Sequence, residues 1–194
     1  DGSVPPPTAR PQVALEHFAY FPGTALPAAA WSFVPSPFDD YRVLVLLATI
    51  GCFFAVLLFD APLPWRLAVG AAVAASPLLV RGAWFGTADA TGILALLLAF
   101  GLLARSRYAW AAVALAAAIL LKQFALVAVP FFAVMLLARG LPRPVLVRSA
   151  VAFVAVLAAG FLPFLVADAG ALWRDTISYG ADTYRILGYG LSAL

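Results

Sequence analysis

Six long apolar stretches, each bounded by charged or polar residues, limit what this chain of 194 residues can fold into. They are Val43–Phe59, Leu67–Val80, Ala90–Ala104, Tyr108–Leu121, Phe124–Ala138 and Ser149–Val166. Hydrophobic residues make up 65% of the chain and charged residues only 11%. A soluble domain has roughly 25% charged residues, so this chain has too few charges to cover its apolar surface in water. We therefore predict an all-α, polytopic transmembrane bundle of about six short helices.

These stretches are short for membrane spans. The first and last contain about 17–18 residues and the other four about 14–15, which is roughly 21–23 Å of helix at 1.5 Å per residue. The hydrocarbon layer of a bilayer is roughly 30 Å thick. We therefore expect the polar helix ends to lie at membrane depth, where they line a protein-walled cavity.

The regions before and after the apolar stretches have a different composition. Residues 1–41 are rich in proline and aromatic residues, which predicts an extracytoplasmic loop containing a short interfacial helix within 25–34 that Pro27 begins. The transmembrane region is expected at 42–166 and a second extracytoplasmic loop at 167–194. Because the chain begins with Asp1 and has no signal-peptide pattern, we expect it to be a fragment of a longer protein.

The arginines predict the orientation. If each stretch crosses once and the N-terminal loop lies outside, the inner connections are 60–66, 105–107 and 139–148, with six basic residues and one acid. This distribution satisfies the positive-inside rule and places the single lysine, Lys122, on the extracytoplasmic face. The basic residues are scattered along the chain, which argues against a nucleic-acid surface.

Lys122 and Gln123 interrupt the apolar segment AAAILLKQFALVAVPFF at 116–132. One helix over 108–138 would extend about 46 Å, so we predict two short helices that meet at this pair, the second kinked at Pro130. The lysine could simply reach the interface with its ammonium. Alternatively it binds an anion such as a lipid phosphate, which Gln123 would orient, and charges at membrane depth favour this functional interpretation.

Acidic residues supply two further candidates. Asp89, in RGAWFGTADA at 81–90, either serves the start of the next helix or lies at the floor of an active-site cleft. The adjacent acids Asp39–Asp40 precede the first stretch, where the helix dipole favours them, and a metal site there is the alternative. The chain has one histidine and one cysteine and lacks HExxH, GxSxG and P-loop motifs.

Four segments together resemble a known family. They are FAYFPG (18–23), WFGTADA (84–90), the segment at 116–132 and LPFLVADAGALWRDTISY (162–179). In residues and order they resemble elements of actinobacterial glycosyltransferase family 87-like proteins of the GT-C superfamily. The resemblance implies a membrane enzyme that transfers a mannose- or arabinose-like sugar from a polyprenyl-phosphate donor to a lipid, glycan or glycolipid acceptor on the extracytoplasmic side.

The resemblance also implies a carboxylate base in the first outer loop, which we expect upstream of Asp1, with Asp89 as the second candidate. The residues expected at the site are Lys122, Gln123 and Arg81 for the donor phosphate and His17, Tyr20 and Tyr179 for the substrate loop. No cofactor is predicted, and a divalent metal stays open. The alternatives are a transporter or flippase, whose internal repeats we do not find between 42–104 and 108–166, and a non-catalytic membrane scaffold.

Overall fold

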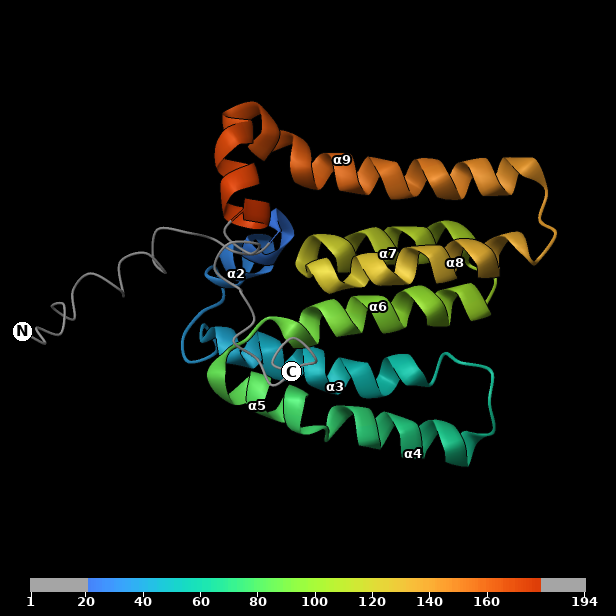
Figure 1. Cartoon of the computed structure of the whole chain (residues 1–194). Helices are drawn as coiled ribbons and strands as arrows, with labels where there is room; N and C mark the ends of the chain where they lie inside the picture. The colour runs from blue at the N-terminus through green and yellow to red at the C-terminus, as the bar shows by residue number, and fades with distance from the viewer. Residues whose placement is uncertain (1–20, 179–194) are drawn as a thin grey trace, which may run out of the picture.

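A computed structural model describes residues 21–178, which form helices and contain no strand (Figure 1). The predicted all-α class is confirmed for this part of the chain. The elements are η1 (Pro22–Thr24), α2 (Ala25–Trp31), α3 (Tyr41–Val56), α4 (Leu63–Ala74), α5 (Pro77–Phe85), α6 (Asp89–Ala104), α7 (Tyr108–Leu121), η2 (Gln123–Val127), α8 (Ala128–Leu137), α9 (Arg143–Trp173) and η3 (Arg174–Ser178).

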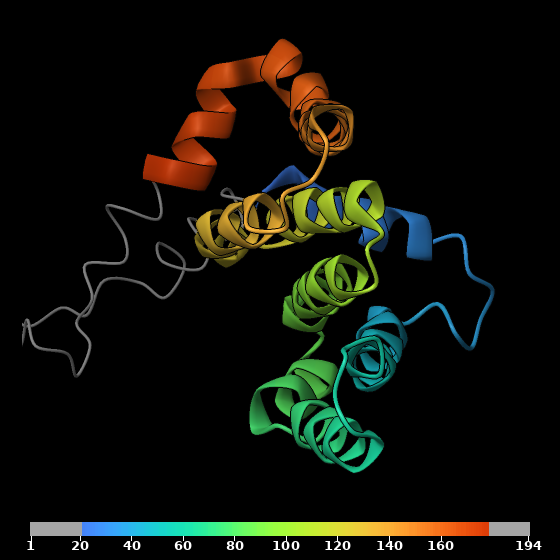
Figure 2. The same ribbon diagram turned by 90° about the vertical axis from the view of Figure 1, so that its right-hand side faces the viewer.

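The long helices run side by side in a stack. Helices α4 and α5 pack on α3, α3 packs on α6, α6 on α7, and α7 on α9. Helix α8 turns back after α7, so the two form a hairpin (Figures 1 and 2). The connections 57–62, 86–88, 105–107 and 138–142 therefore lie at one of two opposite ends of the stack, while the break between α4 and α5 lies partway along it.

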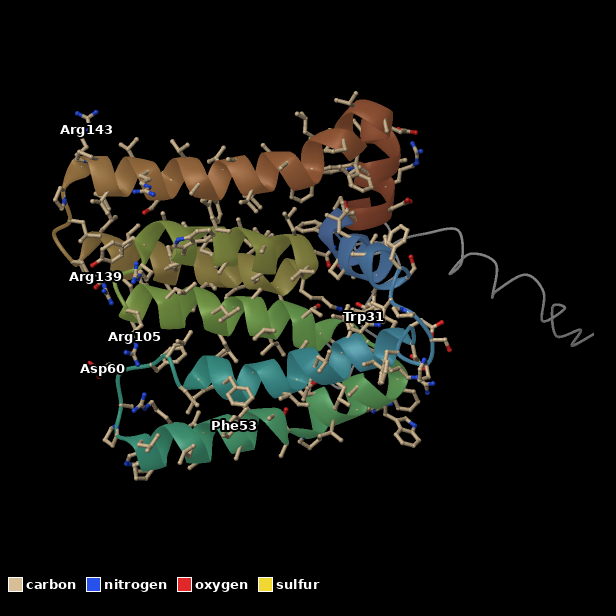
Figure 3. The ribbon with its side chains drawn as sticks, turned by 180° about the vertical axis from the view of Figure 1, so that it is seen from behind. Trp31, Phe53, Asp60, Arg105, Arg139 and Arg143 are labelled. Carbon is tan, nitrogen blue, oxygen red and sulfur yellow. The ribbon has the colours of Figure 1, made fainter. Side chains whose placement is uncertain are left out.

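The two ends differ in charge. We call one the arginine end, formed by the connections 57–62, 105–107 and 138–142 with the adjoining helix starts; Figure 3 shows Asp60, Arg105, Arg139 and Arg143 there. The opposite lysine end is formed by residues 21–24, 86–89, 122–123 and 168–178. Lys122 therefore lies at the end opposite to these arginines, as the sequence predicts.

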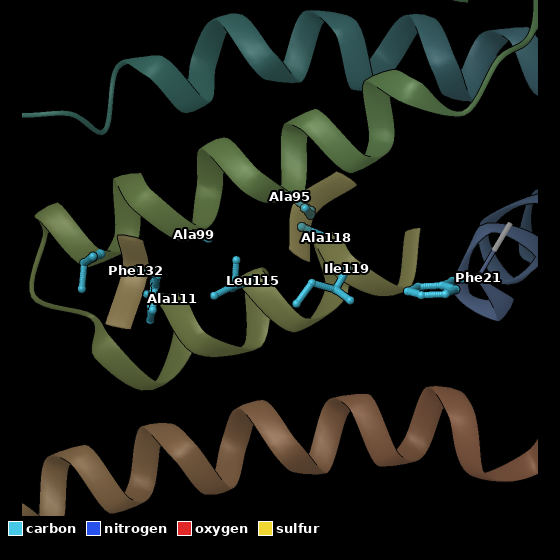
Figure 4. Packing of buried hydrophobic residues seen from close by; sticks show 10 residues of the cluster. Phe21, Ala95, Ala99, Ala111, Leu115, Ala118, Ile119 and Phe132 are labelled. Carbon is cyan, nitrogen blue, oxygen red and sulfur yellow. The ribbon is translucent and has the colours of Figure 1, made fainter. Parts of the chain in front are cut away.

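Small side chains make close packing of α6 and α7 possible. Ala95 and Ala99 of α6 and Ala111 and Ala118 of α7 are buried, and Leu115, Ile119 and Phe132 fill the space beside them (Figure 4). The small alanine side chains let the backbones of the two helices approach closely, as small residues do at interfaces between membrane helices. At the lysine end Phe21 joins this cluster, and its ring meets that of Phe161 edge to face at 5.1 Å.

In the described part of the chain, one helix is by itself long and apolar enough to cross a bilayer. It runs through α9 over Arg143–Thr176, with a mean hydropathy of 2.5 and 6% of its most apolar window buried. The pair α4 and α5 meets the same criteria only when counted together across a 44° bend. Helices α3, α6, α7 and α8 are shorter, with 16, 16, 14 and 10 residues.

Two of the predicted helices are wrong in extent. The stretch Leu67–Val80 is broken at Ala75–Ser76, where Pro77 begins α5 and the Ser76 hydroxyl accepts a hydrogen bond from the Leu79 amide at 3.5 Å. Proline is suited to the first helical position and cannot continue a preceding helix, which explains the break. The stretch Ser149–Val166 is instead part of a helix of 31 residues, α9.

Pro27 and Pro130 occupy helix positions that differ from the predicted ones. Pro130 does not kink a helix but lies in the first turn of α8, where its missing amide costs no helical hydrogen bond. The helix expected within 25–34 is present as α2, but it starts at Ala25, two residues before Pro27.

The second outer loop, expected from residue 167, begins as helix. Helix α9 continues past Val166 to Trp173 and is interrupted at Asp168, whose backbone is extended (φ −162°, ψ 94°). The Asp168 carboxylate accepts a hydrogen bond from the Ala171 amide at 2.8 Å, so it starts the final helical segment. Of this predicted loop, residues 179–194 lie outside the described residues, as do residues 1–20 of the first.

Candidate functional site

Lys122 marks the point at which α7 stops. Its backbone is extended (φ −151°, ψ 125°), while its amide still donates to the Ala118 carbonyl at 2.8 Å. Its carbonyl accepts from the Ala125 amide at 3.1 Å, which starts the single 3-10 turn η2 before α8. The prediction of two helices that meet at Lys122–Gln123 is confirmed.

The Lys122 side chain turns inward and forms an ion pair. Its Nζ lies 2.9 Å from Oδ1 of Asp89, with the lysine side chain 9% exposed and the aspartate side chain 27% exposed. Asp89 is the first residue of α6, and in this first turn its charge also complements the helix dipole. The interpretation of Asp89 as a helix-start residue alone is therefore wrong, because its carboxylate is also the partner of the ammonium.

Gly92 provides the space through which the lysine reaches Asp89. A Cβ atom at Gly92 would lie 2.8 Å from Cγ and 2.9 Å from Cβ of Lys122. The aliphatic stem of the lysine thus lies directly against the backbone of α6, one turn after Asp89. The register of α6 against α7 fixes the ion pair.

The first described residues close the site from a third direction. The Thr24 hydroxyl donates to the Leu121 carbonyl at 2.5 Å, and so satisfies an acceptor that the end of α7 leaves without a helical partner. A Cβ atom at Gly23 would lie 2.5 Å from Cβ and 2.7 Å from the carbonyl oxygen of Leu120. The end of the segment FAYFPG therefore packs tightly on the two residues before Lys122.

Gln123 connects the break to the end of α9. Its Nε2 donates to the Thr176 carbonyl at 3.3 Å, a contact between residues 53 positions apart in the sequence. Thr176 is 9% exposed, and its hydroxyl donates to the Leu172 carbonyl at 2.5 Å. All four segments that carry the family resemblance therefore contribute described residues to the lysine end.

A cavity of about 320 Å³ lies beside this junction, between η1, α2 and the last part of α9. Its walls are mostly apolar, including Pro22, Phe164 and Leu172, and its polar residues are Asp168, Asp175 and Thr176. The cavity thus shares Thr176 with the Gln123 contact and offers an apolar surface with carboxylates at its edge.

Among the described residues, Arg81 is the predicted site residue that is not brought to the ion pair. Arg81 lies exposed on α5 with its guanidinium carbon 5.4 Å from the centre of the Phe85 ring, and no contact of the described residues joins it to Lys122 or Gln123. The substrate-loop candidates His17, Tyr20 and Tyr179 lie outside the described residues.

Sequence reasoning missed the residues that shape the site rather than carry its charge. Gly92 and Thr24 are examples, because their importance depends on which helix faces the end of α7. The sequence does contain one signal for them: in TADATG at 87–92, small residues surround the carboxylate of Asp89. Within residues 21–178, no group of three or more His, Cys, Asp or Glu side chains is placed to hold a metal ion.

Comparison of the chain with family models, with curated proteins and with solved structures finds no match in any of the three.

Proposed function

We propose that this chain belongs to an integral membrane glycosyltransferase that takes a sugar from a polyprenyl-phosphate donor and transfers it to a lipid or glycan acceptor at the lysine end. The observation that carries the proposal is the ion pair between Lys122 and Asp89 at a helix break. A buried ammonium paired with a carboxylate oxygen 2.9 Å away can exchange that partner for the phosphate of a lipid carrier.

The surface of the stack supports placement in a bilayer. Exposed large hydrophobic residues occur along α3, α4, α8 and α9, including Phe54 at 60%, Trp65 at 67% and Val166 at 79% exposure. Soluble proteins rarely expose contiguous apolar patches of more than a few hundred Å². Arg105, Arg139 and Arg143 lie at the end opposite Lys122, which agrees with a lysine end that faces the extracytoplasmic side.

The proposed reaction is a displacement at the anomeric carbon of the donor sugar. An acceptor hydroxyl oxygen forms the new bond to that carbon, and the bond from carbon to the phosphate oxygen breaks with its electron pair leaving on polyprenyl phosphate. Lys122 offsets the charge that builds on this phosphate. The hydroxyl proton passes to a carboxylate, for which Asp89 becomes available as the phosphate takes over the ammonium.

The test measures sugar transfer from radiolabelled polyprenyl-phosphate mannose and arabinose in membranes that contain the protein carrying this chain. Lys122→Ala is expected to abolish transfer while the protein still inserts, because the leaving phosphate loses its counter-charge. Asp89→Asn is expected to reduce transfer strongly, and Arg81→Gln to leave most of it, since Arg81 lies apart from the ion pair.

Unchanged turnover in Lys122→Ala, with insertion verified by resistance to carbonate extraction, contradicts the proposal. A transporter is the competing class, because helices broken near membrane depth are also typical of substrate sites in transporters. Movement of a lipid-linked sugar across vesicles without a change in its covalent bonds would favour the transporter.

A further inference from the structure

The arginine end contains a second cavity that the proposed reaction does not use. It has a volume of about 380 Å³ and lies between the start of α7 and the first turns of α9. Arg107 and Arg148 contribute to its walls from these two elements, together with Tyr108, Trp110 and Ser149. Two guanidinium groups from separate helices therefore line one opening.

No carboxylate of the described residues is paired with these arginines. Within residues 21–178, Arg42 pairs with Asp40 and Lys122 with Asp89, both toward the lysine end. A third arginine, Arg139, adds positive charge nearby, with its guanidinium carbon 5.7 Å from the centre of the Tyr108 ring. The cavity is thus a concentration of positive charge that suits an anion.

A smaller apolar cavity of about 150 Å³ lies next to this opening, between α7, α8 and α9. The two cavities share Ser149, whose hydroxyl is occupied by a bond to the Val145 carbonyl at 2.9 Å. The apolar cavity is lined by α7, α8 and α9, including Leu115, Phe132 and Ala150. A charged opening with an apolar groove beside it suits a molecule with an anionic head and a hydrocarbon chain.

We infer that this end binds an anionic phospholipid, with its phosphate between Arg107 and Arg148 and the upper part of one acyl chain along the groove of α7, α8 and α9. Arginine binds phosphate oxygens with its planar, multiply donating group, and basic pockets between helices on the cytoplasmic side suit anionic headgroups. Trp110 also lines the cavity and is 66% exposed, and tryptophan is enriched where a membrane protein meets the lipid headgroups. The inference depends on the bilayer placement and not on sugar transfer.

The test titrates the detergent-purified protein with phosphatidylglycerol, phosphatidylcholine or inorganic phosphate and counts bound molecules by native mass spectrometry. Phosphatidylglycerol is expected to bind more tightly than phosphatidylcholine. Because each arginine near a membrane surface contributes about a fivefold factor, Arg107→Gln/Arg148→Gln is expected to weaken phosphatidylglycerol binding roughly thirty-fold. Arg143→Gln is the control, since Arg143 lies at the same end but outside the cavity lining.

A second variant separates a lipid from a free phosphate. Ala150→Phe places a ring in the apolar groove from an exposed position on α9, and it is expected to weaken lipid binding while inorganic phosphate binds as before. Equal affinity for the two lipids, or unchanged binding in the double arginine variant, overturns the inference. Tight inorganic phosphate binding with lipid binding insensitive to Ala150→Phe also overturns it and identifies a phosphate site instead.

Discussion

At the scale of single residues, the site depends on a missing side chain as much as on charged ones. Lys122 reaches Asp89 because Gly92 leaves room for its stem. Taking two charges out of water costs free energy, which their attraction offsets only if the geometry is good. The contact between lysine stem and glycine backbone supplies that geometry, since it restricts where the ammonium can lie.

Gly92→Ala is therefore expected to disturb the ion pair. The new methyl group would overlap Cβ and Cγ of Lys122, which lie near the root of the side chain and cannot move away without shifting α7. We expect a loss of about 1–3 kcal/mol in the free energy of unfolding, which is typical of an overpacked interior. Thermal unfolding in detergent measures this loss.

The matched control is Gly51→Ala in α3. There the new Cβ would lie 3.0 Å from a terminal methyl group of Leu94, which can rotate, and alanine is favoured over glycine within a helix by roughly 0.5–1 kcal/mol. This variant is expected to be neutral or slightly stabilised. Equal destabilisation by the two substitutions would show that the contact of Gly92 with Lys122 has no special role.

At the scale of elements, helix starts and breaks are determined by short polar signals within apolar sequence. Helix α3 starts after Asp40, whose Oδ1 accepts a hydrogen bond from the Arg42 amide at 2.8 Å. The expectation that the acids before the first stretch serve the helix start is confirmed for Asp40. The hydrogen bonds from the Arg42 guanidinium and amide hold the pKa of Asp40 below its ordinary value.

This lowered pKa predicts a pH-dependent start of α3. A carboxylate whose pKa is depressed by folding stabilises the folded state above its unfolded pKa of about 3.9, and the contribution disappears as pH falls through the lower folded value. Asp40→Asn keeps an oxygen acceptor but removes the charge. The Tm of wild type is therefore expected to exceed that of the variant at neutral pH, and the two to converge as pH falls through the lowered pKa of Asp40.

The measurement is the Tm of both proteins in detergent between neutral pH and about pH 2.5. Asp39→Asn serves as the control, because Asp39 has no such hydrogen bond among the contacts of the described residues. A difference between wild type and Asp40→Asn that stays constant down to the lowest pH would contradict the prediction.

At the scale of the whole molecule, the polarity of the two ends could be predicted, but the contacts between helices could not. Charged residues within apolar sequence indicate where helices end, so the break at Lys122 and its separation from the arginines followed from local sequence. The pairing of Asp89 with Lys122 needed the register of α6 against α7. The apolar stretch does not reveal the full length of α9, because its first turns contain Arg143 and Arg148, and arginine stems can lie along an apolar helix.

If the two ends of the stack lie on opposite sides of the bilayer, the residues before α3 and those after it are accessible from opposite sides of the membrane. In a Cys52→Ala background, which removes the buried native thiol, Asp39→Cys and Asp60→Cys introduce matched exposed cysteines on either side of this helix. A membrane-impermeant maleimide is expected to label Asp39→Cys in intact cells and Asp60→Cys only after permeabilisation. Labelling of both from the same side would contradict the bilayer placement.

The absence of a side chain at position 92 also has a consequence for how this protein can evolve. A lineage that replaced the lysine by a short residue would leave a void beside α6, which an alanine or serine at position 92 could then occupy. The reverse order is costly, because a side chain at position 92 must displace the lysine stem. Descendants of this chain are therefore expected to change positions 92 and 122 in concert, with the lysine lost before the glycine.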